Sequence, residues 1–244
     1  MRVFLAIVVL LAFSGGIASA QEFPLSDVIP QGDGTFSGRL IQGLIALTVL
    51  SIAPGLLITT TCFTRFIIAF SFLRSGLGLQ STPSNLIVIS LSLFMTYFVM
   101  TPVFEQAWKD GVQPLIDNQI SEEEAFEKVT DPLKEFMSQH IREKDLELFE
   151  QFVGKQLPEA TSVEPELRTI IPAFLLSELR RGFEIGFLIL LPFLIIDLVV
   201  STVTMSMGMM MLPPTVVSLP FKVLFFVLID GWHLIVGELL NSVI

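Results

Sequence analysis

Long uncharged hydrophobic stretches alternate with shorter polar ones along this chain. Residues Leu40 to Thr64 carry no charge over 25 positions, and Ser75 to Phe104 carry none over 30. About twenty apolar residues are enough for a helix to cross a bilayer, so each stretch can form one span. Two further apolar stretches, Ile170 to Val200 and Leu212 to Ile244, follow a polar middle segment. The pattern predicts an all-α, membrane-associated protein made of helical hairpins.

Proline and turn residues predict where these helices break or begin. Pro54-Gly55 lies midway through the first stretch, which predicts a kink or a broken helix there. The turn residues from Gly76 to Ser84 place the start of the next helix near Asn85. In the polar segment, Ser121 and Glu124 form a capping box, and Asp131-Pro132 predicts a second helix start. Apolar residues at helical spacing predict two or three short amphipathic helices.

The first twenty residues have the pattern of a secretory signal peptide. Arg2 precedes an apolar core that ends at Phe13, and Ala18-Ser19-Ala20 is an A-x-A cleavage site. The core is too short to cross a bilayer. The alternative to a cleavable signal peptide is a first helix that stays uncleaved.

Charge placement predicts the topology and the division of the chain. Arg65 and Arg74 bracket the connection between the first two apolar stretches, which places that connection in the cytoplasm by the positive-inside rule. The polar segment then lies outside the cytoplasm. We expect a signal peptide at 1–20, an extracytoplasmic segment at 21–38, a first hydrophobic hairpin at 39–104, an acidic amphipathic segment at 105–170, and a second hydrophobic hairpin at 171–244.

The net charge of −10 comes almost entirely from the polar segment. Between Glu105 and Arg168 there are 16 acids and 7 bases, and the rest of the chain is almost neutral. Without a basic patch, the chain is not expected to bind DNA or RNA. The acidic helix faces are either solvated surface or a docking surface for a partner. The single cysteine, Cys62, lies in an apolar run and is expected to be a packing residue.

The last third of the chain carries ionisable residues inside its apolar stretches. A charge that faces lipid costs about 2.5–3.5 kcal/mol on insertion scales, so these residues must face protein, water or one another. On a helix, Arg180 and Glu184 are i,i+4, and Glu178 and Arg181 are i,i+3. Lys222 is a further candidate partner for Glu178 on a neighbouring helix or subunit. Gly182 and Gly186 form a G-x-x-x-G pattern that permits close approach of another helix.

Five of the nine methionines fall within seven residues, 205–211, ahead of Pro213-Pro214. Core packing would space them three or four apart, whereas this run predicts an irregular loop. Methionine is flexible and packs against irregular shapes. A ring of such loops would form a deformable apolar seal; the alternative is a membrane turn of no special role. The candidate residues are Met205, Met207, Met209, Met210 and Met211.

No catalytic or metal-binding motif is present in the sequence. There is no H-E-x-x-H, P-loop or G-x-S-x-G pattern, and the two histidines, His140 and His233, lie far apart. We therefore expect no enzyme activity, no metal and no cofactor. His140 is expected to be exposed, and His233 is either a buried structural residue or a proton-responsive one. Two rival hypotheses remain, a structural scaffold and a proton-coupled small-solute transporter using Glu178, Asp197, Asp230 and His233.

Two long segments resemble one protein family. Pro172 to Trp232 reads PAFLLSELRRGFEIGFLILLPFLIIDLVVSTVTMSMGMMMLPPTVVSLPFKVLFFVLIDGW, and Phe63 to Asn85 reads FTRFIIAFSFLRSGLGLQSTPSN. Both resemble the FliP family of export-gate proteins, and the resemblance covers essentially the whole chain after the signal peptide.

The resemblance implies a subunit of the flagellar type III protein export gate, a helical channel for unfolded flagellar proteins in the bacterial inner membrane. It implies about five copies around a symmetry axis, assembled with FliQ-like and FliR-like chains. Much of that assembly stands on the periplasmic side, at the flagellar basal body, so apolar helices need not all contact lipid. The resemblance also assigns the methionine loop to a gasket that closes the pore. The signal peptide and the long acidic segment favour the flagellar branch over the injectisome branch.

Overall fold

A computed structural model describes residues 36–79, 82–156, 167–208 and 213–244, and every regular element in these ranges is helical. The all-α prediction is therefore confirmed. The predicted signal peptide at 1–20 lies outside the described residues, as does most of the segment that follows it. The chain divides into two compact units, Met1–Leu50 and Ser51–Ile244. In the first unit, the described part is the start of one helix; the second contains the core.

The helices follow one another with short connections. Their bounds are α2 Phe36–Thr60, α3 Phe63–Leu77, α4 Asn85–Ala107, the π-helical turn η2 Trp108–Val112, α5 Gln113–Ile116, α6 Glu122–His140, α7 Glu143–Gln156, α8 Leu167–Ser206, α9 Pro214–Leu228 and α10 Gly231–Asn241. Helix α4 begins at Asn85, where the turn residues predicted a start. The second hydrophobic hairpin consists of α8 and the broken pair α9 and α10.

The break in the first apolar stretch lies at Thr61 and Cys62, and α2 continues through Pro54. The segments on either side, Pro54–Thr60 and Phe63–Leu77, meet at 83°. Threonine hydroxyls make this bend possible because they satisfy the last carbonyl groups of α2. The Thr61 hydroxyl donates to the Leu57 carbonyl at 2.6 Å, and the Thr64 hydroxyl reaches back to the Ile58 carbonyl at 2.9 Å.

The acidic segment forms two amphipathic helices, α6 and α7, and Ser121 is the N-cap of α6, the first half of the predicted capping box. The Ser121 hydroxyl accepts a hydrogen bond from the Glu124 amide at 3.2 Å. The prediction that Asp131-Pro132 starts a new helix is wrong, because α6 runs through Pro132. The Thr130 hydroxyl donates to the carbonyls of Phe126 and Glu127 in the preceding turn.

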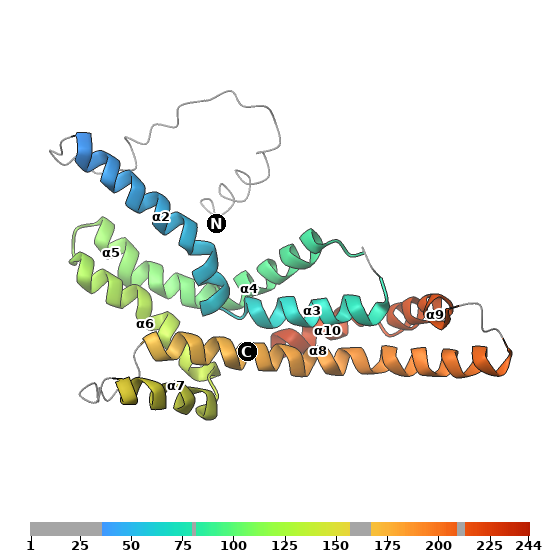
Figure 1. Ribbon diagram of the computed structural model, residues 1–244. Coiled ribbons are helices and arrows are strands. Elements are labelled where there is room, and N and C mark those ends of the chain that lie inside the picture. Colours follow the sequence, from blue (N-terminus) through green and yellow to red (C-terminus); the bar gives the residue numbers. More distant parts are fainter. Residues whose placement is uncertain (1–35, 80–81, 157–166, 209–212) are drawn as a thin grey trace, which may run out of the picture. The chain divides into compact units, whose positions relative to one another are not determined.

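Helix α8 is the axis of the second unit. Helix α3 lies along the middle part of α8, while α6 and α7 pack near the N-terminal end of α8 (Figure 1). The G-x-x-x-G face of α8 permits the close approach of α3. A Cβ atom at Gly182 would lie 3.3 Å from the Arg65 Cα, and one at Gly186 would lie 2.6 Å from Cδ2 of Phe72. The predicted glycine face therefore serves packing within the chain.

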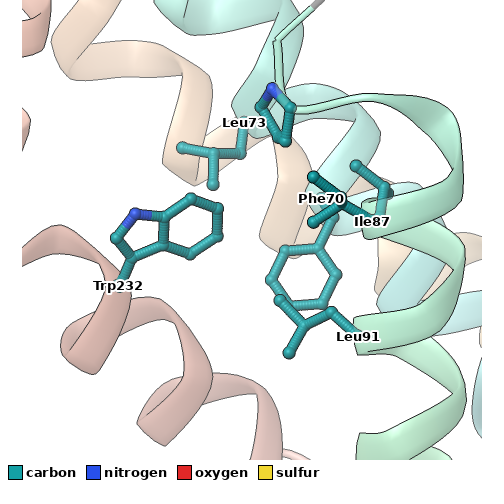
Figure 2. Close-up of a pocket in the computed structure, with 7 residues that line it drawn as sticks. Phe70, Leu73, Ile87, Leu91 and Trp232 are labelled. Atoms are coloured by element: carbon teal, nitrogen blue, oxygen red, sulfur yellow. The ribbon is translucent and has the colours of Figure 1, made fainter.

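A buried apolar cluster joins α3 to α4, α8 and α10. Figure 2 shows its edge, where Trp232 of α10 faces Phe70 and Leu73 of α3 and Ile87 and Leu91 of α4. The Phe70 and Trp232 rings have centroids 6.5 Å apart. The cavity between these side chains measures about 10 Å³ and is lined by apolar atoms, so it gives no ligand a site.

Two described helices are long and apolar enough to cross a membrane, namely Asn85–Ile116 and Leu167–Ser206. Two bent pairs satisfy the same criteria when each is taken as one span. They are Pro54–Thr60 with Phe63–Leu77, and Pro214–Leu228 with Gly231–Asn241, which are bent by 65°. Helix α8 exposes many of its large apolar side chains, including Phe187, Leu188, Ile195 and Leu198.

The glycine face gives a first prediction. Replacing Gly186 with alanine should lower the free energy of unfolding by about 1–3 kcal/mol, because the new methyl group collides with the base of the Phe72 ring. Gly237→Ala in α10 is the matched control, since a Cβ atom there meets nothing within 4 Å. Thermal unfolding in detergent should rank Gly186→Ala below the wild type and Gly237→Ala at or above it. Equal midpoints for the two variants would contradict the close contact of α3 with α8.

Candidate functional site

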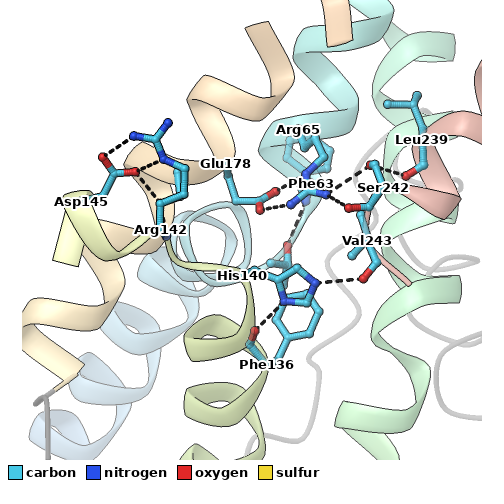
Figure 3. A network of polar contacts seen from close by, with 12 residues as sticks. Phe63, Arg65, Phe136, His140, Arg142, Asp145, Glu178, Leu239, Ser242 and Val243 are labelled. Carbon is cyan, nitrogen blue, oxygen red and sulfur yellow. Dashed lines mark hydrogen bonds and ion pairs between the residues drawn. The ribbon is translucent and has the colours of Figure 1, made fainter. Parts of the chain in front are cut away.

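The deepest polar site of the described residues joins α3, α8 and the C-terminal end of α10. Arg65 and Glu178 have fully buried side chains. The Arg65 Nε donates to the Glu178 Oε2 at 2.9 Å, and its Nη2 donates to Oε1, so the pair is bidentate. The Arg65 Nη1 donates to the Ser242 carbonyl and to its Oγ, the latter at 3.2 Å. Figure 3 shows the guanidinium between Glu178 and Ser242.

Local sequence explains why these groups meet. Arg65 lies in the first turn of α3, directly after the sharp bend at Thr61 and Cys62. Glu178 lies one turn before Gly182, where the missing side chain lets the α3 backbone approach α8. Among the described residues, no buried side-chain nitrogen or oxygen lacks a hydrogen-bond partner. The two charges are therefore neutralised as a pair, which offsets the cost of removing them from water.

The structure changes the predicted pairing of the α8 charges. Glu178 pairs with Arg65, so the predicted pairs with Arg181 and Lys222 are wrong within this chain. Arg180 and Glu184 do form their i,i+4 pair, at 2.7 Å, but their side chains are 57% and 56% exposed. In this chain their pair is on the surface, because α3 covers the opposite, glycine-bearing face of α8. Arg181 is half-buried and forms none of the ion pairs found in the described ranges.

A second polar site lies toward the other end of α8. The Lys222 ammonium of α9, with a side chain 6% exposed, donates to the Asp197 Oδ2 at 2.6 Å and to the Gly76 carbonyl at 2.9 Å. The Ser218 hydroxyl donates to the other carboxylate oxygen of Asp197 at 2.6 Å. Lys222 was predicted to be buried and paired. Its partner in the structure is Asp197.

The methionine loop connects α8 to α9. Met205 and Met207 are 66% and 67% exposed at the end of α8, and Gly208 has a φ of 74°, which starts the turn. Met209, Met210 and Met211 lie outside the described residues. The last turns of α8 and the first residues of α9 border an open groove of about 580 Å³, whose lining includes Asp197 and Met205.

Ionisable groups of the rival transporter hypothesis do not gather in one place. Glu178 and Asp197 belong to the two separate ion pairs, and Asp230 and His233 are exposed at the start of α10. His140 was predicted to be exposed, and this is wrong. It is half-buried, with Nδ1 2.7 Å from the Phe136 carbonyl and Nε2 2.9 Å from the Val243 carbonyl.

Sequence reasoning missed four contributors to the two polar sites. Arg65 was used only as a topology signal, and Ser242, Ser218 and the Gly76 carbonyl carry no distinguishing pattern. Arg65 itself could have indicated the site. It directly follows a 25-residue uncharged stretch, and a cation in such a place needs a partner of opposite charge. Cys62 is fully buried in the core, as predicted. Within the described residues, no three His, Cys, Asp or Glu side chains group as metal ligands.

The Arg65–Glu178 pair gives a second prediction. Glu178→Gln should lower the free energy of unfolding by about 3–5 kcal/mol, because it leaves a buried guanidinium without its counter-charge. The double variant Arg65→Met, Glu178→Met should recover part of that loss, because no charge then remains buried. Thermal unfolding in detergent measures the first effect directly, and the second as a double-mutant cycle that includes the single variants Arg65→Met and Glu178→Met.

The exposed pair on the same helix is the control. Glu184→Gln should change stability by less than about 1 kcal/mol, because solvent screens the Arg180–Glu184 pair. Equal losses from Glu178→Gln and Glu184→Gln, or a double variant no more stable than either single one, would contradict direct buried pairing.

Comparison with known proteins places the chain in a family. The family model described as the FliP family matches residues 46–239. The flagellar biosynthetic protein FliP of Agrobacterium fabrum is 54% identical over 243 residues, which cover 99% of this chain and 98% of that protein. The protein of the same name from Bacillus subtilis is 55% identical over 83% of this chain and 91% of its own length, and that of Aquifex aeolicus is 42% identical over 96% and 97%. The matches run through both hydrophobic hairpins and the acidic segment, and the chain therefore belongs to the FliP family of flagellar biosynthetic proteins.

Proposed function

We propose that this chain is a pore-forming subunit of the flagellar type III protein export gate, through which unfolded flagellar proteins pass. The observation that carries the proposal is the exposure of Met205 and Met207 at the end of α8, where the chain turns toward α9, in a chain of this family. An apolar end on a hairpin whose two helices are joined by the Asp197–Lys222 ion pair suits a seal that projects toward an axis. The chain needs no cofactor for this role.

Exposed apolar surface supports assembly. A contiguous apolar surface on a protein marks contacts with other proteins or with lipid. The α9 helix exposes Val216, Phe221, Leu224, Val227 and Leu228. We infer about five copies of the chain around the pore axis, completed by FliQ-like and FliR-like subunits in the inner membrane at the flagellar basal body. Much of each copy stands on the periplasmic side.

The methionine loop is the proposed gasket. Methionine side chains are unbranched and have three rotatable bonds, so a ring of them can close around a narrow axis and deform around a passing chain. The apolar lining excludes hydrated ions when no chain is present. The gasket comprises Met205, Met207, Met209, Met210 and Met211.

The two rival hypotheses differ from this one in their geometry and in their consequences. A proton-coupled transporter needs ionisable groups along one path, and Glu178 and Asp197 are instead occupied by separate buried partners. A scaffold without a pore gives the methionines no role, so their replacement would leave membrane conductance unchanged.

The gasket gives a third prediction. Deleting Met209–Met211 should raise the ion conductance of bilayers that contain the assembled complex, while the complex keeps its mass. The matched control replaces the same three residues with leucine, which keeps the apolar volume and should keep the leak within a few-fold of the wild type. Conductance that stays at the wild-type level after the deletion, in a complex of normal mass, would overturn the gasket.

A further inference from the structure

Several ionisable side chains of the last three described helices have no partner within this chain. Glu178, Asp197 and Lys222 belong to the two buried pairs, and Arg180 bonds to Glu184. A charge in an apolar helical stretch is costly where it faces lipid, so the remaining ones must meet water or another protein. Within α8, α9 and α10 as described, the ionisable side chains that take part in none of the ion pairs or side-chain hydrogen bonds are Arg168, Arg181, Asp230, His233 and Glu238.

Arg65 gives a common reference level for α8 and α10. Its guanidinium bonds to Glu178 on α8 and to Ser242 at the end of α10. Figure 3 shows these two partners on different sides of the guanidinium. Positions along α8 and α10 can therefore be compared by counting residues from Glu178 and from Ser242.

Both helices extend from this level along α3 in the same direction. On α8, Gly186 lies against the Phe72 ring, where a Cβ atom would come within 2.6 Å. On α10, Trp232 lies near Phe70, with the ring centroids 6.5 Å apart. Along α3 from Arg65 onward, residue numbers therefore rise on α8 and fall on α10.

Arg181 and Glu238 lie at nearly the same level. Arg181 comes three residues after Glu178, and Glu238 comes four residues before Ser242. At the rise of an α-helix these steps are about 4.5 Å and about 6 Å, in the same direction along α3. Arg181 is half-buried and Glu238 is exposed. The chain thus presents one cation and one acid at matching height on two different helices.

The other side chains without a partner in the described chain lie at other levels. Arg168 is in the first turn of α8, about 15 Å before the buried pair at the helical rise. Asp230 and His233 lie at the bend between α9 and α10, at the far end of α10. The matched opposite charges are therefore Arg181 and Glu238.

Exposed apolar side chains accompany both charges. Leu188 follows Arg181 by seven residues, which places it on the same stripe of α8, and Leu234 precedes Glu238 by one turn of α10. Both leucines lie on the same side of their charge along α3. A contact between the two stripes would therefore bring the charges together and the leucines together in one register.

We propose that Arg181 of each copy pairs with Glu238 of the neighbouring copy, so that the α8 stripe of one subunit docks on the α10 stripe of the next. The inference rests on the proposed multi-copy gate and names the contact that joins its copies. A rotation about an axis along α3 keeps each residue at its level, so rotation alone brings the two charges together. A contact between two different patches of this kind repeats around an axis and can close into a ring.

The first experiment crosslinks the two stripes while keeping both charges. Two full-length copies with different tags are expressed together, one with Leu188→Cys and the other with Leu234→Cys, and membranes are treated with a short bismaleimide. We expect a crosslinked dimer that carries both tags. Replacing the second copy by one with Glu147→Cys, an exposed position on α7, should give none. Cys62 is fully buried and does not compete.

The second experiment exchanges the charges. Arg181→Glu and Glu238→Arg each place like charges across the contact, so each should lower the yield of assembled complex about tenfold. The double variant Arg181→Glu, Glu238→Arg should recover to within about threefold of the wild type, because the pair is restored in reverse. Glu147→Arg is the matched control for a charge reversal and should leave the yield unchanged. Native mass spectrometry measures the yield.

The possible failures are distinguishable. A complex of normal mass without the two-tag dimer would overturn the contact, and so would a double variant that folds but assembles no better than the single ones. Crosslinking of Leu188→Cys to a protein of different sequence, in place of a second copy, would also overturn it. If the charge variants fail to fold, the crosslink decides, because its variants keep Arg181 and Glu238.

These outcomes leave the gasket in place, since the conductance of the Met209–Met211 deletion tests it separately. A wild-type complex that contains a single copy of this chain would overturn the proposed multi-copy gate and the contact together.

Discussion

The buried pair of Arg65 and Glu178 is the constraint on which the rest of the structure depends. An ion of either sign inside an apolar helical protein is tolerated only with a partner, and each oxygen of Glu178 has one in the same guanidinium. That requirement aligns α3 with α8, and the third donor of Arg65 binds the Ser242 carbonyl at the end of α10. Gly182 lets the two helices approach closely enough for this geometry. Apolar contacts alone would allow α3 to pack on α8 at several positions along the helix axis. The ion pair selects one of these positions.

The second pair, Asp197 with Lys222, applies the same constraint 19 residues further along α8. At the helical rise the two carboxylates lie about 28 Å apart, so α8 is held near both ends. Between and beyond them its large apolar side chains stay exposed, available for lipid or for other subunits. Within the described ranges, every buried side-chain nitrogen and oxygen of this frame has a hydrogen-bond partner. The Asp197–Lys222 pair joins the two helices of the hairpin, and the exposed methionines Met205 and Met207 make the end of α8 apolar.

Local features of the chain could be predicted from the sequence, and long-range partners could not. The start of α4 at Asn85 and the cap at Ser121 follow from turn and capping chemistry within a few residues. The partner of Glu178 lies 113 residues away, and the i,i+3 rule pointed instead to Arg181. Proline was a weaker signal than the caps: α2 is unbroken at Pro54 and α6 runs through Pro132, so neither proline ends its helix. The proposed role of the methionine loop rests on the family resemblance, because the exposure of Met205 and Met207 alone does not specify a seal.

The central claim is that the α8–α9 tip lines the path of an exported chain. Crosslinking from Met207→Cys to a flagellar substrate arrested during export tests it most directly, because that position is exposed and the native Cys62 is buried. The account predicts a crosslink to the arrested substrate from Met207→Cys and none from Glu147→Cys on α7. Absence of a substrate crosslink at position 207, in cells where export through the variant gate continues, would contradict it.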